Sequence, residues 1–116
     1  SRLRNTLIRS ARPLIFSDSE LAAYVEEWSQ PGRLTTMLNY YRALRLPQPR
    51  PGPISMPTLI LWGRKDSFLL PALATESART CRDGRIRWFN DATHWLHHEQ
   101  PRQVATEIAA FASGGK

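Results

Sequence analysis

The sequence predicts an α/β fold in which parallel strands and helices alternate in the order βαβα, preceded by a segment of helices. The first observation is the apolar run PTLILWG, which extends from Pro57 to Gly63 and has the composition of a strand buried on both faces. The second is a short strand expected at residues 85–89. The third is that a helical pattern follows each strand, an alternation typical of parallel sheets with crossover helices.

Two helices are expected before the first strand. Ser17 and Glu20 have the spacing of a capping box, which starts a helix by satisfying its first free amides. The apolar stripe of this helix is Leu21, Tyr24, Val25 and Trp28. We expect Pro31 and Gly32 to end it. One side of the second helix is formed by Leu34, Leu38, Tyr41 and Arg45. Pro47 should end that helix, because proline disfavours a helical residue before it.

Two further helices are expected around the second strand. One should begin near Pro71, a favourable first helical residue, and end at Asp83 and Gly84. The other should begin at Pro101 and run toward the sequence SGGK. Its apolar side consists of Val104, Ile108 and Phe111.

The composition divides the chain into three parts: helices at 1–46, a proline-rich linker at 47–56 and the strand-containing part at 57–116. Two strands cannot form a stable sheet alone, so we expect the C-terminal part of a larger α/β domain. The N-terminal residues SRLRNTLIRSARP are basic, show no pattern and begin without methionine. They suggest a chain cut from something longer.

Composition and charge argue against several classes of function. The net charge is +6, but the arginines are scattered rather than clustered, which disfavours a nucleic-acid partner. Cys81 is the single cysteine, and neither CxxC nor HxxxH occurs, so we expect no metal site. A reducing, cytoplasmic location fits this cysteine usage. No stretch reaches the ~20 apolar residues of a membrane span, and the N-terminus does not resemble a secretory signal.

Asp66 and His94 occupy equivalent positions, each a few residues after a predicted strand. The carboxyl ends of parallel strands meet at one edge of the sheet, where catalytic groups gather. An aspartate bonded to one imidazole nitrogen fixes the tautomer and leaves the other nitrogen free to take a proton. The alternative is that Asp66 is a turn or capping residue and His94 an ordinary polar loop residue. We interpret the two residues as a catalytic pair.

Three segments in this order resemble the epoxide hydrolase branch of the α/β-hydrolases, over residues from about 16 to 112. They are LNYYRAL at 38–44, GRKD at 63–66, and THW followed by HEQP before the final helix. The resemblance implies that residues 1–46 belong to a helical cap, or lid, over the active site. It also implies that Asp66 orients His94, that His94 activates water to hydrolyse a covalent intermediate, and that Tyr41 donates its phenolic hydrogen to the epoxide oxygen. The resemblance further implies a reaction that uses no cofactor. Tyr40 is the competitor for this last role.

Several neighbouring side chains have two interpretations. Phe68, Leu69 and Trp95 flank the predicted site and would line a pocket for a small apolar substrate that reacts with water, or they are plain core residues. Tyr24 and Trp28 are expected to pack the cap. His97 and His98 are expected to be solvated and Cys81 to be structural.

The sequence departs from the family pattern in ways that leave the reaction open. No GxSxG-type nucleophile elbow and no oxyanion loop occur in these residues, so we expect the nucleophile upstream of Ser1 and the chain alone to be inactive. Thr93 stands where a glycine usually precedes the histidine. A haloalkane or haloacid dehalogenase and an esterase share the Asp and His pattern, and a non-catalytic binding module or pseudoenzyme is the alternative of another class. Oligomeric state is not predicted.

Overall fold

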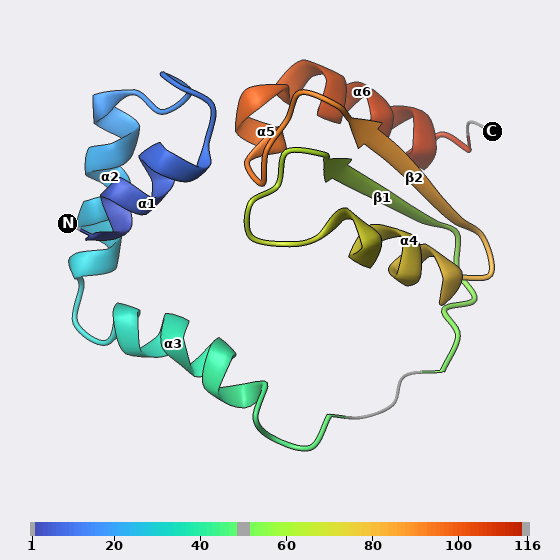
Figure 1. The fold of residues 1–116 in the computed structure, drawn as a ribbon, viewed down its shortest axis with the longest axis horizontal. Coiled ribbons are helices and arrows are strands. Elements are labelled where there is room, and N and C mark those ends of the chain that lie inside the picture. Colours follow the sequence, from blue (N-terminus) through green and yellow to red (C-terminus); the bar gives the residue numbers. More distant parts are fainter. Residues whose placement is uncertain (1, 49–51, 115–116) are drawn as a thin grey trace.

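The computed structural model describes residues 2–48 and 52–114 and contains six helices and two strands in these ranges (Figure 1). In chain order they are α1 (Arg2–Ser10), α2 (Asp18–Ser29), α3 (Arg33–Ala43), β1 (Thr58–Gly63), α4 (Pro71–Arg79), β2 (Gly84–Phe89), α5 (Leu96–Glu99) and α6 (Pro101–Ala112). Part of the predicted linker, residues 49–51, lies outside the described residues.

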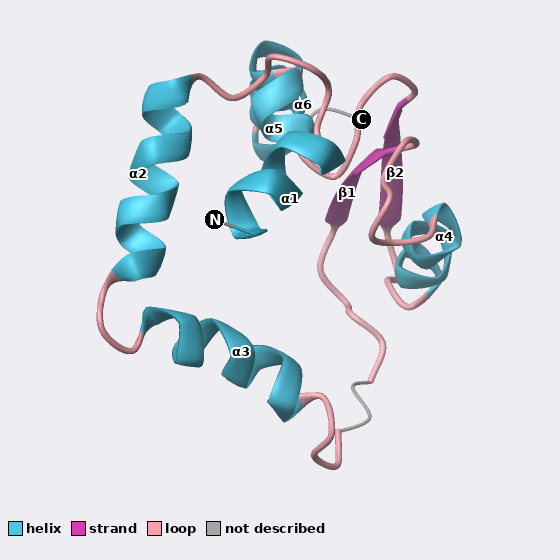
Figure 2. Cartoon of the chain, turned by 60° about the vertical axis from the view of Figure 1, so that its left-hand side comes forward, coloured by secondary structure: helices cyan, strands magenta, loops and turns pink. Residues whose placement is uncertain are grey.

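The strand pair confirms the predicted βαβα order. β1 and β2 are parallel and in register from Thr58 opposite Gly84 to Gly63 opposite Phe89. Helix α4 connects them, and α4 and α6 lie on opposite sides of the strand pair (Figures 1 and 2). Both strands therefore end at the same edge, which faces the three N-terminal helices.

The predicted capping box starts α2. The Ser17 hydroxyl accepts from the Glu20 amide at 3.3 Å, and the Glu20 carboxylate accepts from the Ser17 amide at 2.8 Å. The N-terminal residues, in which the sequence showed no pattern, form a helix that was not predicted, α1, which begins at Arg2. Its arginines obscure the pattern, but Leu7 is 3% exposed and packs against Phe16 and Leu21 from α2 and the segment before it.

Two helices end earlier than predicted, each for a local reason. Helix α3 ends at Ala43, where the Gln48 side chain donates to the Ala43 carbonyl at 2.8 Å. Helix α4 ends at Arg79 rather than at residues 83–84, because residues 80–82 pair with Ile54. The Ile54 amide donates to Thr80 at 2.9 Å, and its carbonyl accepts from Arg82 at 2.8 Å. The short helix α5 was not predicted.

The core of the described residues is small and open. The radius of gyration is 16.7 Å, whereas a compact chain of this length has about 13 Å. Strand β1 is mostly half-buried rather than covered on both faces as predicted, and the Trp62 indole nitrogen is buried without a hydrogen-bond partner in the described part of the chain. Within residues 2–48 and 52–114, no helix combines the length and apolar character needed to cross a bilayer.

Candidate active site

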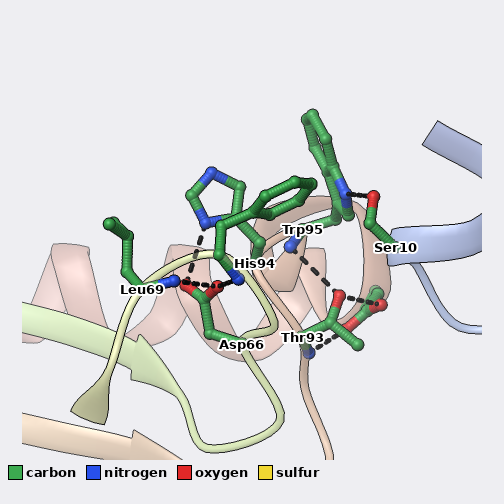
Figure 3. A network of polar contacts seen from close by, with 8 residues as sticks. Ser10, Asp66, Leu69, Thr93, His94 and Trp95 are labelled. Atoms are coloured by element: carbon green, nitrogen blue, oxygen red, sulfur yellow. Dashed lines mark hydrogen bonds and ion pairs between the residues drawn. The ribbon is translucent and has the colours of Figure 1, made fainter. Parts of the chain in front are cut away.

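The structure brings Asp66 and His94 together at the carboxyl ends of the two strands. The His94 Nδ1 atom lies 2.8 Å from an Asp66 carboxylate oxygen, a hydrogen-bond distance (Figure 3). The Asp66 side chain is 6% exposed and that of His94 is 37% exposed. The carboxylate is thus enclosed while the imidazole keeps a face open to the surroundings.

The second oxygen of Asp66 organises the loop after β1. It accepts from the backbone amides of Phe68 at 2.8 Å and Leu69 at 3.0 Å. Asp66 is therefore a turn residue as well as the hydrogen-bond partner of His94, and the catalytic role of the two residues stays a prediction. Backbone donors on one oxygen thus hold the carboxylate while its other oxygen contacts the imidazole.

The environment of Asp66 favours its charged form. Burial raises the pKa of Asp66, but the hydrogen bonds from His94, Leu69 and Phe68 outweigh burial, so the pKa is lowered from its ordinary value of 3.8. A carboxylate can only accept hydrogen bonds, so the proton in the contact with His94 lies on Nδ1. In a neutral imidazole with its proton on Nδ1, the Nε2 atom is an acceptor, which is the form that a general base requires.

His94 faces a cavity of about 460 Å³, a volume suited to a small ligand. Its walls come from α1, α2, α3 and the loops after both strands. The lining residues are Leu3, Thr6, Leu7, Trp28, Met37, Tyr41, Phe68, Leu69, His94 and Trp95. Five predicted site residues thus line one cavity, namely Tyr41, Phe68, Leu69, His94 and Trp95. Asp66 is not part of the lining but is bonded to His94. The contribution of α1 was missed because the helix itself was not predicted.

The structure distinguishes the two adjacent tyrosines of α3. Tyr41 belongs to the cavity lining, whereas Tyr40 does not. The exposed fraction is 71% for Tyr41 and 80% for Tyr40. Neighbouring residues on a helix point about 100° apart, so only one of the two can face His94.

Two aromatic rings contact the imidazole of His94. The Phe68 ring lies 5.1 Å from that of His94 and the Trp95 ring lies 5.4 Å from it, both edge to face. We call residues 90–95, between β2 and α5, the histidine loop. Trp95 donates its indole N–H to the Ser10 hydroxyl at 2.8 Å, which connects the histidine loop to the end of α1 (Figure 3).

Comparison with known proteins identifies the family of the chain. The model of the alpha/beta hydrolase family matches residues 2–107. The chain belongs to the alpha/beta hydrolase family. Together with the parallel βαβα order, this match confirms the predicted fold class.

Several curated proteins are similar to this α/β-hydrolase chain. The AB hydrolase superfamily protein YfhM of Bacillus subtilis is 42% identical over 104 residues, which are 88% of this chain and 36% of that protein. Epoxide hydrolase 2 of Caenorhabditis elegans is 40% identical over 83% of this chain and 28% of its own length. Epoxide hydrolase 3 of Xenopus tropicalis is 38% identical over 82% and 26%. The predicted likeness to epoxide hydrolases is confirmed, and the chain spans 26% to 36% of the length of these three relatives.

Residues outside the pair differ in how well their environment was predicted. His97 is exposed as expected, but His98 is half-buried. Its Nε2 atom lies 3.2 Å from the Tyr24 hydroxyl, because α5 turns the ring toward α2. Cys81 donates to the Ser77 carbonyl at 3.3 Å, which fits a structural role. Among the described residues, no three His, Cys, Asp or Glu side chains gather in a metal-binding cluster.

Proposed function

We propose that this chain carries the histidine, the acid and a cap tyrosine of an epoxide hydrolase, which adds water to an epoxide to give a diol. The observation that carries the proposal is that Tyr41 and His94 line one cavity while His94 is bonded to Asp66 at 2.8 Å. The pair of Asp66 and His94 suits hydrolysis in general. Tyr41 is the group that favours an epoxide, because ring opening needs a proton donor at the oxygen.

In the first step, a carboxylate supplied from outside these 116 residues attacks one carbon of the epoxide. The carbon–oxygen bond of the ring breaks, and the Tyr41 hydroxyl gives its proton to the departing oxygen. The products are an ester between the carboxylate and the substrate, with one new hydroxyl, and a tyrosinate.

In the second step, the His94 Nε2 atom takes a proton from water as the water oxygen bonds to the ester carbonyl carbon. Asp66 stabilises the imidazolium that forms. The ester bond then breaks, the departing alkoxide receives the proton from His94, and the second proton of the water restores Tyr41. The sum is one epoxide and one water converted to one diol, with no cofactor required.

The cavity walls support a small apolar substrate. Phe68, Leu69 and Trp95 give aromatic and aliphatic surface beside His94, and Leu7 and Trp28 continue it from the helices. Since the indole N–H of Trp95 is donated to Ser10, it is not free to bind a halide ion. Trp95 therefore offers no indole donor to a halide in this cavity.

The test is a steady-state assay of the protein as its gene encodes it, on a styrene-oxide-like epoxide. His94→Gln should abolish diol release, and Tyr41→Phe should lower kcat about 10²-fold or more, as loss of a donor to a developing oxyanion does. Tyr40→Phe is the matched control and should retain the wild-type rate. Activity indifferent to Tyr41→Phe would replace the proposal with an esterase or dehalogenase.

A further inference from the structure

The carboxylate of Glu99 is the meeting point of three hydrogen bonds next to His94. One oxygen accepts from the Thr93 backbone amide at 2.7 Å. The other accepts from the Thr93 hydroxyl at 2.7 Å and from the Arg12 backbone amide at 2.9 Å. Both oxygens are therefore engaged, and two of the three donors belong to the residue that directly precedes His94. Hydrogen bonds to a charged acceptor are about twice as strong as neutral ones.

The Thr93 hydroxyl has a second role in this network. While it donates to Glu99, its oxygen accepts from the Trp95 backbone amide at 3.2 Å (Figure 3). The backbone on both sides of His94 is thus tied, directly or through one hydroxyl, to a single carboxylate. A glycine at position 93 could offer Glu99 only its amide.

The opposite side of the histidine loop rests on β1. A Cβ atom placed on Gly63 would lie 2.2 Å from the Thr93 carbonyl oxygen, so the two backbones are in direct contact. The Lys65 amide also donates to the Ala92 carbonyl at 2.9 Å. The loop is consequently held between β1 and Glu99, with His94 as the side chain that leaves it toward the cavity.

We propose that Glu99 is a positioning residue for His94, acting through Thr93. Through the Arg12 amide, the same carboxylate connects the histidine loop to the segment after α1, the helix that forms one wall of the cavity. The consequence for catalysis rests on the proposed function. On this account Thr93, which departs from the family pattern, supplies one of the bonds that hold the catalytic base. Displacing a catalytic group by about 1 Å can cost 10²-fold in rate, so this anchoring acts on kcat.

Thr93→Val and Thr93→Ser form the matched test pair, because valine keeps the shape without the hydroxyl and serine keeps the hydroxyl. Thr106→Val is the control, since the exposed Thr106 hydroxyl only donates to the Arg102 carbonyl at 2.9 Å on α6. The first readout is the NMR resonance of the His94 Nδ1 proton in the protein as its gene encodes it. This signal reports the bond to Asp66, and a merely structural role of Thr93 would leave it in place in the folded fraction.

Thr93→Val should shift or broaden this resonance and lower kcat about tenfold or more, with KM little changed. Thr93→Ser and Thr106→Val should leave the resonance in place and keep kcat within about twofold of the wild-type value. Glu99→Ala should have a larger effect than Thr93→Val. Glu99→Gln should recover part of it, because its amide oxygen can replace one carboxylate oxygen while its amide nitrogen cannot accept from the donors at the other. If Glu99→Ala does not fold, the threonine pair decides the question.

An unchanged resonance in Thr93→Val would overturn the inference, whether or not kcat falls. If the wild-type protein opens no epoxide, the proposed function fails, and the NMR comparison still decides whether Glu99 and Thr93 position His94.

Discussion

Gly63→Ala tests whether the close contact between β1 and the histidine loop sets the geometry of the site. The new Cβ atom would lie 2.2 Å from the Thr93 carbonyl oxygen and 2.6 Å from that of Ala92, whereas ordinary contacts begin at 3.4 Å. Because both neighbours are backbone atoms, the loop must retreat by roughly 1 Å, with an overpacking cost of about 1–3 kcal/mol. That displacement is large beside the 2.8 Å bond between His94 and Asp66.

We expect Gly63→Ala to lower kcat for epoxide hydrolysis about 10²-fold and to lower the thermal midpoint. Gly52→Ala is the matched control, because a Cβ at Gly52 would meet nothing within 4 Å. The assay is diol formation by the protein as its gene encodes it, with circular dichroism to measure unfolding. A Gly63→Ala protein with the wild-type rate and midpoint would refute the argument from contact distance.

Three further predictions concern the pair, the helix contact and the chain alone. Because the pKa of Asp66 is lowered, its contribution to stability is present above pH 3.8 and is lost as the pH falls below that value. The difference in thermal midpoint between wild type and Asp66→Asn should therefore shrink on acidification. A difference independent of pH would contradict this. Ser10→Ala leaves the Trp95 indole N–H without its acceptor and should lower the free energy of unfolding by about 1–3 kcal/mol. Ser113→Ala, on an exposed helix end, should lower it little. Equal losses in chemical denaturation would count against the contact. The isolated 116-residue chain should melt without cooperativity or self-associate, because large apolar side chains such as Leu70, at 73% exposure, remain uncovered. A sharp melt of a monomer in calorimetry would disprove this.

The sequence predicted those elements whose signals are local. Pro57 and Gly63 bound the first strand, and the Ser17 and Glu20 capping box marks the start of α2, because each signal lies within a few residues of the structure it produces. The contact between Asp66 and His94 was also predictable, since the topology of parallel strands brings their carboxyl ends to one edge.

Contacts between distant residues were not predictable in this way. Helix α1 depends on the packing of Leu7 against Phe16 and Leu21, a tertiary contact that its own basic sequence does not predict. The hydrogen bond from Arg12 to Glu99 joins residues 87 positions apart, and no spacing rule connects them. Helix lengths were overestimated where a later segment, such as Ile54, competes for the backbone groups of the last turn.

The most direct test of the central claim is intact-protein mass spectrometry of His94→Gln after mixing with a styrene-oxide-like epoxide. If His94 activates the water that cleaves a covalent ester, this variant of the protein as its gene encodes it should accumulate an adduct heavier by one substrate molecule. The wild-type protein should show diol and little adduct at the same time point. Diol release by His94→Gln at the wild-type rate, with no adduct, would contradict the assignment of His94 as the base.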